Sequence, residues 1–186
     1  MSRWLGCLLL VFGLAAQAAP SAPADDGISR LIEDKGLLTR LEEARVTMRD
    51  KASDLVVNAM GFLGVPYRRG GTSAETGGFD CSGFVRAMYA QTVGLVLPRR
   101  ANEQAAATQT IDRNDLQPGD LVFFNTMRRA FSHVGIYVGE GKFIHSPKPG
   151  AEVRMEDMSG RYWQQRFDGA RRVVGLLHED AFPAQP

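Results

Sequence analysis

The chain has 186 residues, and its 22 lysines and arginines nearly balance 21 aspartates and glutamates, for a formal net charge of +1. A balance this even gives no global argument for nucleic acid or a charged membrane surface as a partner. The length suits one domain with its own hydrophobic core. Function must therefore be sought in local motifs.

Residues 1–18 have the pattern of a secretory signal peptide. Arg3 precedes an apolar stretch from Leu5 to Ala16, and Ala16-Gln17-Ala18 is a small-residue cleavage site. We expect cleavage after Ala18 and a secreted, periplasmic mature protein. The stretch is short for a bilayer, which needs about 20 apolar residues, so no stable membrane insertion is expected after cleavage. Two alternatives stay open, an uncleaved anchor and a lipid on Cys7.

Residues 19–52 are predicted to be a leader followed by an amphipathic helix. The helix lies within 31–51, either packed on the domain edge or acting as a stalk. A separate helix should begin at Ser53 as its N-cap and stop at Gly64. We place the domain at 53–178 and a C-terminal tail at 179–186. The apolar stripe of the first helix consists of Leu37, Leu38, Leu41, Ala44 and Met48, and that of the second of Leu55, Val56, Ala59, Met60 and Leu63.

Further helices and then strands follow along the chain. The helices are expected at 81–91, with Phe84, Val85 and Met88 buried and Gly94 at its end, and at 99–107. After Pro118, short apolar runs separated by glycine turns predict strands. Helices first and hairpins second indicate an α+β fold, with N-terminal helices packed on an antiparallel β-sheet. The strands are expected at 121–124, 134–138, 142–145, 153–155 and 172–177, with a helix at 162–167 before the last.

Cys81 is the only cysteine that the mature chain would keep. An unpaired thiol in an oxidising compartment is a liability unless its reactivity is used. It follows a glycine-rich approach and Asp80, a plausible helix N-cap. A helix N-terminus lowers a thiol pKa from its free value of about 8.5. We therefore expect Cys81 to be a nucleophile with a lowered pKa, rather than a small core residue.

Two of the three histidines flank a glycine hairpin. If residues 139–141 form a three-residue loop, His133 and His145 share one face of the sheet as diagonal neighbours, about 7–8 Å apart. A two-residue loop would place them on opposite faces. In the three-residue register Gly135 lies opposite His145, which would leave room for a helix end to approach. The same register pairs Val138 with Lys142 and Tyr137 with Phe143.

These residues together predict a catalytic triad. Cys81 is the nucleophile, His133 the general base and later acid, and His145 the group that orients the His133 ring. His178 stands beside a charged tail and is expected to be a bystander. One cysteine and two histidines lack the spacing and the fourth ligand of a zinc site, so no metal and no cofactor are expected.

The motifs, in order, resemble those of the NlpC-type cell-wall cysteine peptidases. The resemblance covers about residues 53–175 and implies a papain-like fold with Cys81, His133 and His145 as the catalytic set. It also implies that Tyr67 lines the site and helps bind the oxyanion, and that Asp80 and Ser82 shape a subsite. The matching segments are Gly64-Val65-Pro66-Tyr67, Phe79-Asp80-Cys81-Ser82-Gly83, 116–124, 133–139 and Phe143-Ile144-His145.

The family cleaves stem peptides of peptidoglycan, either between γ-D-glutamate and a diamino acid or at D-alanyl cross-links. The resemblance therefore implies an endopeptidase that works through an acyl-enzyme, with peptidoglycan stem peptides as its partner. A non-catalytic wall-binding protein and a thiol acyltransferase are the alternatives. We expect a monomer and leave the need for a protein activator open. Four Arg-Arg pairs are candidates to meet substrate carboxylates, at 68–69, 99–100, 128–129 and 171–172.

Overall fold

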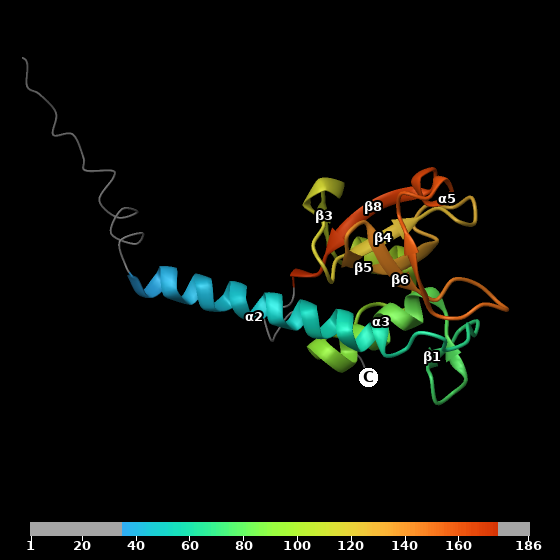
Figure 1. Ribbon diagram of the computed structural model, residues 1–186, viewed down its shortest axis with the longest axis horizontal. Helices are drawn as coiled ribbons and strands as arrows, with labels where there is room; N and C mark the ends of the chain where they lie inside the picture. The colour runs from blue at the N-terminus through green and yellow to red at the C-terminus, as the bar shows by residue number, and fades with distance from the viewer. Residues whose placement is uncertain (1–34, 175–186) are drawn as a thin grey trace, which may run out of the picture. The chain divides into compact units, whose positions relative to one another are not determined.

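The computed structural model describes residues 35–174 (Figure 1). The predicted signal peptide, Cys7, most of the leader, His178 and the C-terminal tail lie outside the described residues. The chain divides into two units, 1–39 and 40–186. Of the first unit, only the first residues of helix α2 (Lys35–Met60) are described.

Helix α2 is one continuous helix of 26 residues, so the predicted break at Ser53 is wrong. Ser53 lies in mid-helix, where its hydroxyl donates to the carbonyl of Arg49 at 3.0 Å. No glycine or proline lies between Leu37 and Met60, and a serine alone does not end a helix. Leu55 is buried near the end of the helix, whereas Leu38 and Leu41 are 55% and 54% exposed. Between residues 35 and 174, no helix combines the length and apolar character needed to cross a membrane.

Helix α3 (Cys81–Val93) agrees with the prediction at both ends. Asp80 caps it by accepting a hydrogen bond from the backbone N–H of Gly83, and Gly94 ends it in the left-handed conformation with φ of 76°. Its expected stripe, Phe84, Val85 and Met88, is completely buried. The next helix, α4 (Ala101–Ala106), is shorter than predicted.

The central sheet has six antiparallel strands in the order β3-β8-β4-β5-β6-β7. The predicted last strand at 172–177 is wrong within the described residues, because β8 ends at Arg172. Its sequence is polar, and pairing with β3 and β4 rather than apolar alternation holds it in the sheet. The strands are β3 (Gln109–Ile111), β4 (Leu121–Phe124), β5 (His133–Gly139), β6 (Lys142–His145), β7 (Arg154–Asp157) and β8 (Phe167–Arg172).

Smaller elements complete the described chain. Helix α5 (Arg161–Gln164) overlaps the helix expected at 162–167, but it begins one residue earlier and ends three residues earlier. A short 3-10 helix (Arg113–Asp115) and a two-stranded hairpin, β1 (Thr72–Ser73) with β2 (Gly78–Phe79), were not predicted. The hairpin lies in the glycine-rich loop that leads to α3.

Both faces of the sheet are covered. The inner face packs against α3, and the outer face carries a second apolar cluster around α5, so the two helices lie on opposite sides of the strands (Figure 1). Strands buried on both faces read as continuous apolar runs, which explains the completely buried Leu-Val-Phe-Phe of β4. The inner face is formed by Leu121, Phe123, Val134, Ile136 and Ile144, and the outer cluster by Val122, Phe124, Phe143, Met158 and Trp163.

Candidate active site

Cys81 is the first residue of α3 and remains partly exposed. The backbone N–H of Val134 in β5 and that of Ser82 point at its thiol. Val134 directly follows His133, so the fold brings the predicted nucleophile to the strand that carries the predicted base.

Glycines let the loop and the helix approach this closely. A Cβ on Gly83 would lie 2.0 Å from the carbonyl oxygen of Gly71, which no side chain tolerates. Gly78 has φ of +127°, and a Cβ there would lie 2.0 Å from the carbonyl oxygen of Pro66. The glycine-rich approach noted in the sequence therefore seats the start of α3 against the loop.

The thiol of Cys81 does not have the lowered pKa that its helix position predicts. The pKa of Cys81 is raised to about 11, chiefly by burial and also by the charge of Asp80, against the opposing effect of the N–H groups of Val134 and Ser82. Desolvation thus outweighs the helix N-terminus. The resting site holds a neutral thiol.

The histidine hairpin reaches the predicted arrangement by a different route. Tyr137 pairs with Phe143 as expected, but Gly139 rather than Val138 pairs with Lys142. The loop is therefore two residues long, and a β-bulge at Val138 supplies the third. One extra residue restores the side-chain alternation that a two-residue loop would reverse.

As a result, His133 and His145 lie on the same face and in contact, as predicted. Nε2 of His133 and Nδ1 of His145 are 2.6 Å apart, with the rings almost perpendicular at 88°. The two residues are 4% and 0% exposed, and the ring of Trp163 stacks on His133. A buried imidazole pair joined by a short hydrogen bond can hold and pass a proton.

Both histidines are neutral in the resting site. Burial lowers the pKa of His133 well below 6.5, and the neighbouring His145 lowers it further. Burial also lowers the pKa of His145, against the opposing effect of Glu156. The low-dielectric surroundings disfavour the charged form of either ring.

The expectation that a helix end fills the space beside Gly135 is wrong. A Cβ on Gly135 would meet the Phe143 ring at 2.6 Å and the Cβ of His145 at 3.2 Å. The two outer-face neighbours occupy this space, whereas α3 packs on the inner face of β5. The small residue therefore serves the packing of the histidine pair.

Asp80 and Ser82 form a cluster with Arg99, a member of one of the four Arg-Arg pairs that the sequence offered as partners for substrate carboxylates. The guanidinium of Arg99 binds both carboxylate oxygens of Asp80, at 3.0 and 2.6 Å, and donates to the hydroxyl of Ser82 at 3.1 Å. Gly70 donates its N–H to the same carboxylate at 3.0 Å. Asp80 thus ties the loop, the helix and Arg99 together, beside the thiol.

Tyr67 lies close to this cluster. Burial raises the pKa of its phenol, and the charges of Cys81 and Asp80 raise it further. Its backbone N–H donates to the carbonyl of Ala151 at 2.8 Å. Tyr67 is therefore close enough to Cys81 and Asp80 to feel their charges, and its role at the site stays a prediction.

Glu156 of β7 is a residue that the sequence analysis missed. Its Oε1 lies 3.5 Å from Nε2 of His145. Strand alternation could have indicated this residue, because Glu156 lies on the same sheet face as Phe143 and His145 once β6 and β7 are paired.

The Arg-Arg pairs are largely engaged within the fold. Arg99 binds Asp80, Arg172 binds Asp120 at 2.7 Å, and Arg171 lies over the ring of Phe131. These contacts lie within the domain. Of these arginines, Arg99 is the one that belongs to the cluster with Asp80 and Ser82 beside Cys81. Across residues 35–174, no three histidine, cysteine or acidic side chains gather in a way that would hold a metal ion.

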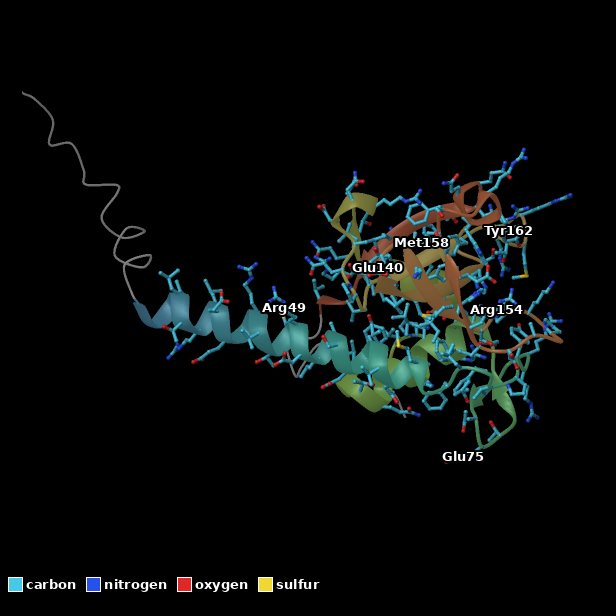
Figure 2. All side chains as sticks on the ribbon, viewed as in Figure 1. Arg49, Glu75, Glu140, Arg154, Met158 and Tyr162 are labelled. Carbon is cyan, nitrogen blue, oxygen red and sulfur yellow. The ribbon has the colours of Figure 1, made fainter. Side chains whose placement is uncertain are left out.

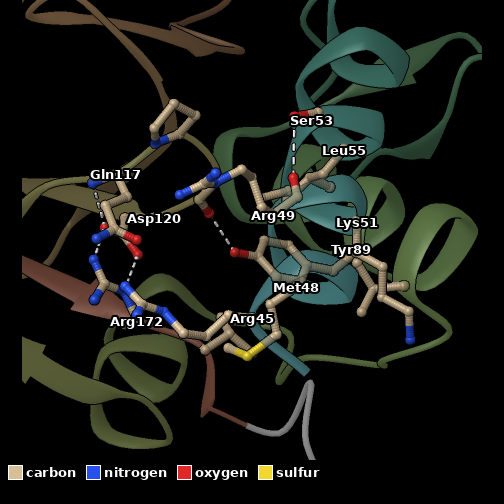
Figure 3. Close-up of a pocket in the computed structure, with 15 residues that line it drawn as sticks. Arg45, Met48, Arg49, Lys51, Ser53, Leu55, Tyr89, Gln117, Asp120 and Arg172 are labelled. Carbon is tan, nitrogen blue, oxygen red and sulfur yellow. Dashed lines mark hydrogen bonds and ion pairs between the residues drawn. The ribbon is translucent and has the colours of Figure 1, made fainter. Parts of the chain in front are cut away.

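A pocket of about 570 Å³ lies elsewhere, between α2, the far end of α3 and the Asp120–Arg172 pair (Figure 3). Tyr89 and Val93 of α3 line it. Val93 is twelve residues from Cys81, or about 18 Å along a helix. None of the predicted site residues lines this pocket, so it is distinct from the candidate active site.

Fold and site together define a papain-like α+β domain with a cysteine at a helix N-terminus and a histidine pair on the facing sheet. The model of the NlpC/P60 family matches residues 64–172, and the chain belongs to this family.

Relatives and solved structures agree with this assignment. The chain is 45% identical over 143 residues to murein DD-endopeptidase MepH of Escherichia coli K12, covering 75% of this chain and 51% of that protein. It is 40% identical over 123 residues to gamma-DL-glutamyl hydrolase of Bacillus subtilis 168, covering 66% and 29%. The crystal structure of an NlpC/P60 family protein from Bacillus cereus superposes with a TM-score of 0.60 at 37% identity, covering 65% and 39%. The chain thus spans about half or less of the length of these proteins.

Proposed function

We propose that this protein is a secreted cysteine endopeptidase that hydrolyses amide bonds in peptidoglycan stem peptides through an acyl-enzyme. The observation that carries the proposal is the meeting of Cys81, at the start of α3, with the strand that begins at His133, while His145 holds the far side of the His133 ring. Relatives named as a murein endopeptidase and a glutamyl hydrolase support this substrate class.

The first step is a proton transfer from the thiol to His133. Because Nε2 of His133 contacts His145, Nδ1 is the nitrogen left to accept the proton. The neutral thiol and neutral imidazole exchange the proton as the substrate arrives, and burial disfavours either charge by itself. The thiolate then attacks the carbonyl carbon of the scissile amide.

The oxyanion forms next to the start of α3. Backbone N–H groups of Cys81 and Ser82 point at this region and would donate to the oxyanion, with the Tyr67 hydroxyl as a further donor. When the C–N bond breaks, the leaving amine takes the proton from His133, and a thioester remains on Cys81. Water, deprotonated by His133, then attacks the thioester and releases the carboxylate and the free thiol.

Arg99 suits a substrate rich in carboxylates. Its side chain is 38% exposed although it binds Asp80, so its outer edge is open to a ligand. Guanidinium groups bind carboxylates in a planar, paired geometry. Stem peptides cleaved at a D-alanyl cross-link or beside γ-D-glutamate both carry free carboxylates, and both bonds fit this proposal.

Digestion of defined muropeptides, followed by mass spectrometry of the products, tests the proposal and identifies the bond. Wild-type protein should release peptides with new amine and carboxylate ends. Cys81→Ala should lose roughly 10⁴-fold or more in kcat, because it removes the sulfur that forms the thioester. Circular dichroism would check that the variant folds. Equal turnover by Cys81→Ala would end the proposal, and ligated products would indicate an acyltransferase instead.

A further inference from the structure

Glu156 lies behind the histidine pair, on the side away from the thiol. We propose that it is a positioning residue, whose carboxylate sets the direction of the protons along His145 and His133 and so keeps the thiol-facing nitrogen of His133 free to accept one. This inference rests on the proposed function, and it adds a fourth member to the predicted set of Cys81, His133 and His145.

Strand register places the carboxylate. In the β6–β7 pair, His145 lies opposite Arg154 and Phe143 opposite Glu156. His145 and Glu156 are therefore diagonal neighbours on one face. Oε1 of Glu156 comes within 3.5 Å of Nε2 of His145, an ion-pair distance that is longer than a good hydrogen bond.

The carboxylate is held firmly by donors on two elements. Arg154 donates from Nε to Oε1 at 2.6 Å and also approaches with Nη2 at 2.5 Å, and the indole N–H of Trp163 donates to Oε2. Its pKa is lowered to about 2, chiefly by its interaction with His145 and further by hydrogen bonds from Trp163 and Arg154. Glu156 is thus an anion, able only to accept hydrogen bonds.

This anion determines which nitrogen of His145 carries the proton. Nε2 of His145 is buried and makes no hydrogen bond to any of residues 35–174, so the adjacent carboxylate is its natural acceptor. A neutral ring has one N–H, and a proton on Nε2 leaves the lone pair on Nδ1. Leaving a buried nitrogen unpartnered beside a carboxylate, with its own lone pair facing the anion, would be unfavourable.

The tautomer of His145 in turn determines the tautomer of His133. Since Nδ1 of His145 must accept, Nε2 of His133 must be the donor across their 2.6 Å contact. The lone pair of His133 then sits on Nδ1, the nitrogen left for the thiol of Cys81. Reversing the direction of these hydrogen bonds would place a proton on Nδ1 of His133, and His133 could then no longer act as a base. A wrong histidine tautomer of this kind costs roughly 10⁴-fold in a serine triad.

The other reading is that Glu156 only braces the fold through Arg154 and Trp163. The groups facing His145 allow the two readings to be separated. Besides Glu156, the charged or titratable neighbours are Arg154 on β7, 46% exposed, and His133 on β5, while α5 contributes the neutral Trp163. A brace affects stability, whereas a positioning carboxylate affects the tautomers and the pH profile.

Glu156→Gln is the decisive variant. The amide keeps the size of the side chain and retains an acceptor for Trp163. It can also offer an N–H to Nε2 of His145, and this favours the reversed direction of the hydrogen bonds. We expect kcat to fall roughly 10²-fold with KM unchanged, less than in a serine triad because a thiol ionises more readily. Loss of the anion should also move the acidic limb of the kcat/KM profile to lower pH, because a carboxylate favours the protonated imidazole.

Two variants serve as comparisons. Glu156→Asp keeps a carboxylate and should lose less than tenfold. Glu140→Gln makes the same chemical change at the tip of the β5–β6 hairpin, where Glu140 meets only Lys142 at 3.7 Å, and it should behave as wild type. Glu140 and Arg154 lie well apart in Figure 2.

A spectroscopic readout does not depend on turnover. The chain has only three histidines, so ¹⁵N-histidine NMR of the resting protein should resolve their tautomers. We expect Nε2–H on both His133 and His145, and Nδ1–H on both in Glu156→Gln. Unchanged tautomers, kcat and pH profile in Glu156→Gln would overturn the inference. Wild-type protein that cleaves no muropeptide would instead refute the proposed function, while the NMR experiment would still report on Glu156.

Discussion

The two faces of the central sheet are both buried but differ in chemistry. The part of the inner face that packs on α3 is apolar, whereas the outer face places two imidazoles and a carboxylate next to an aromatic cluster. The inner face holds the helix that carries Cys81, and the outer face holds the residues that we propose to handle its proton. Strand β5, whose side chains alternate between the faces, connects the two faces through consecutive residues, because His133 lies on the outer face and Val134 on the inner face.

The largest expected effects on activity come from removing each histidine in turn. We expect His133→Ala to lose roughly 10⁴-fold in kcat, because the base itself is gone, and His145→Ala roughly 10²-fold, because His133 keeps its position beside the thiol but loses its hydrogen-bond partner. Steady-state kinetics on a defined muropeptide would measure both. Equal losses, or a larger loss for His145→Ala, would show that the two roles are assigned incorrectly.

Matched phenylalanines test whether the faces separate stability from activity. Phe123 on the inner face and Phe143 on the outer face are both completely buried. Truncating either to alanine should cost roughly 3–5 kcal/mol of unfolding free energy, measured in urea. Only Phe143→Ala should also lower kcat, by about tenfold, since its ring packs against His145 with centroids 4.8 Å apart. A comparable fall in kcat for Phe123→Ala would contradict this separation.

The buried histidines should also make stability depend on pH. Their pKa values are lowered from 6.5, so below pH 6.5 the unfolded chain binds protons that the folded protein does not. Stability is therefore complete above pH 6.5 and falls as the pH decreases, by up to about 1.4 kcal/mol per pH unit for each ring. Urea unfolding between pH 7.5 and 5 would measure the slope.

His145→Gln removes one of these titrating rings. Its slope between pH 6.5 and 5 should be about half that of the wild type, whereas a substitution on the inner face should leave the slope unchanged. An identical slope in His145→Gln would show that the ring does not titrate as its burial implies. Glu156 acts in a separate window, because its lowered pKa withdraws stability only between its ordinary pKa of 4.5 and about 2.

Local chemistry made much of the fold predictable. The Asp80 cap, the Gly94 stop and the apolar stripe of α3 depend on neighbours a few residues apart, so sequence spacing was sufficient. The apolar strands at 121–124 and 142–145 were predicted with their observed bounds. Ser53 failed because a good N-cap residue is tolerated inside a helix when its hydroxyl bonds back to the previous turn.

Residue types and their spacing indicated which residues could do chemistry and, through strand alternation, that His133 and His145 lie together. How these residues meet depends on the packed chain: the bulge at Val138 restores the common face of the histidines, burial reverses the expected shift in the pKa of Cys81, and β7 and the segment before α4 bring Glu156 and Arg99 to the site. The difference arises because the two kinds of interaction act over different separations along the chain. Caps and periodicity act within a few residues, whereas desolvation and contacts between distant strands exist only after the chain has packed.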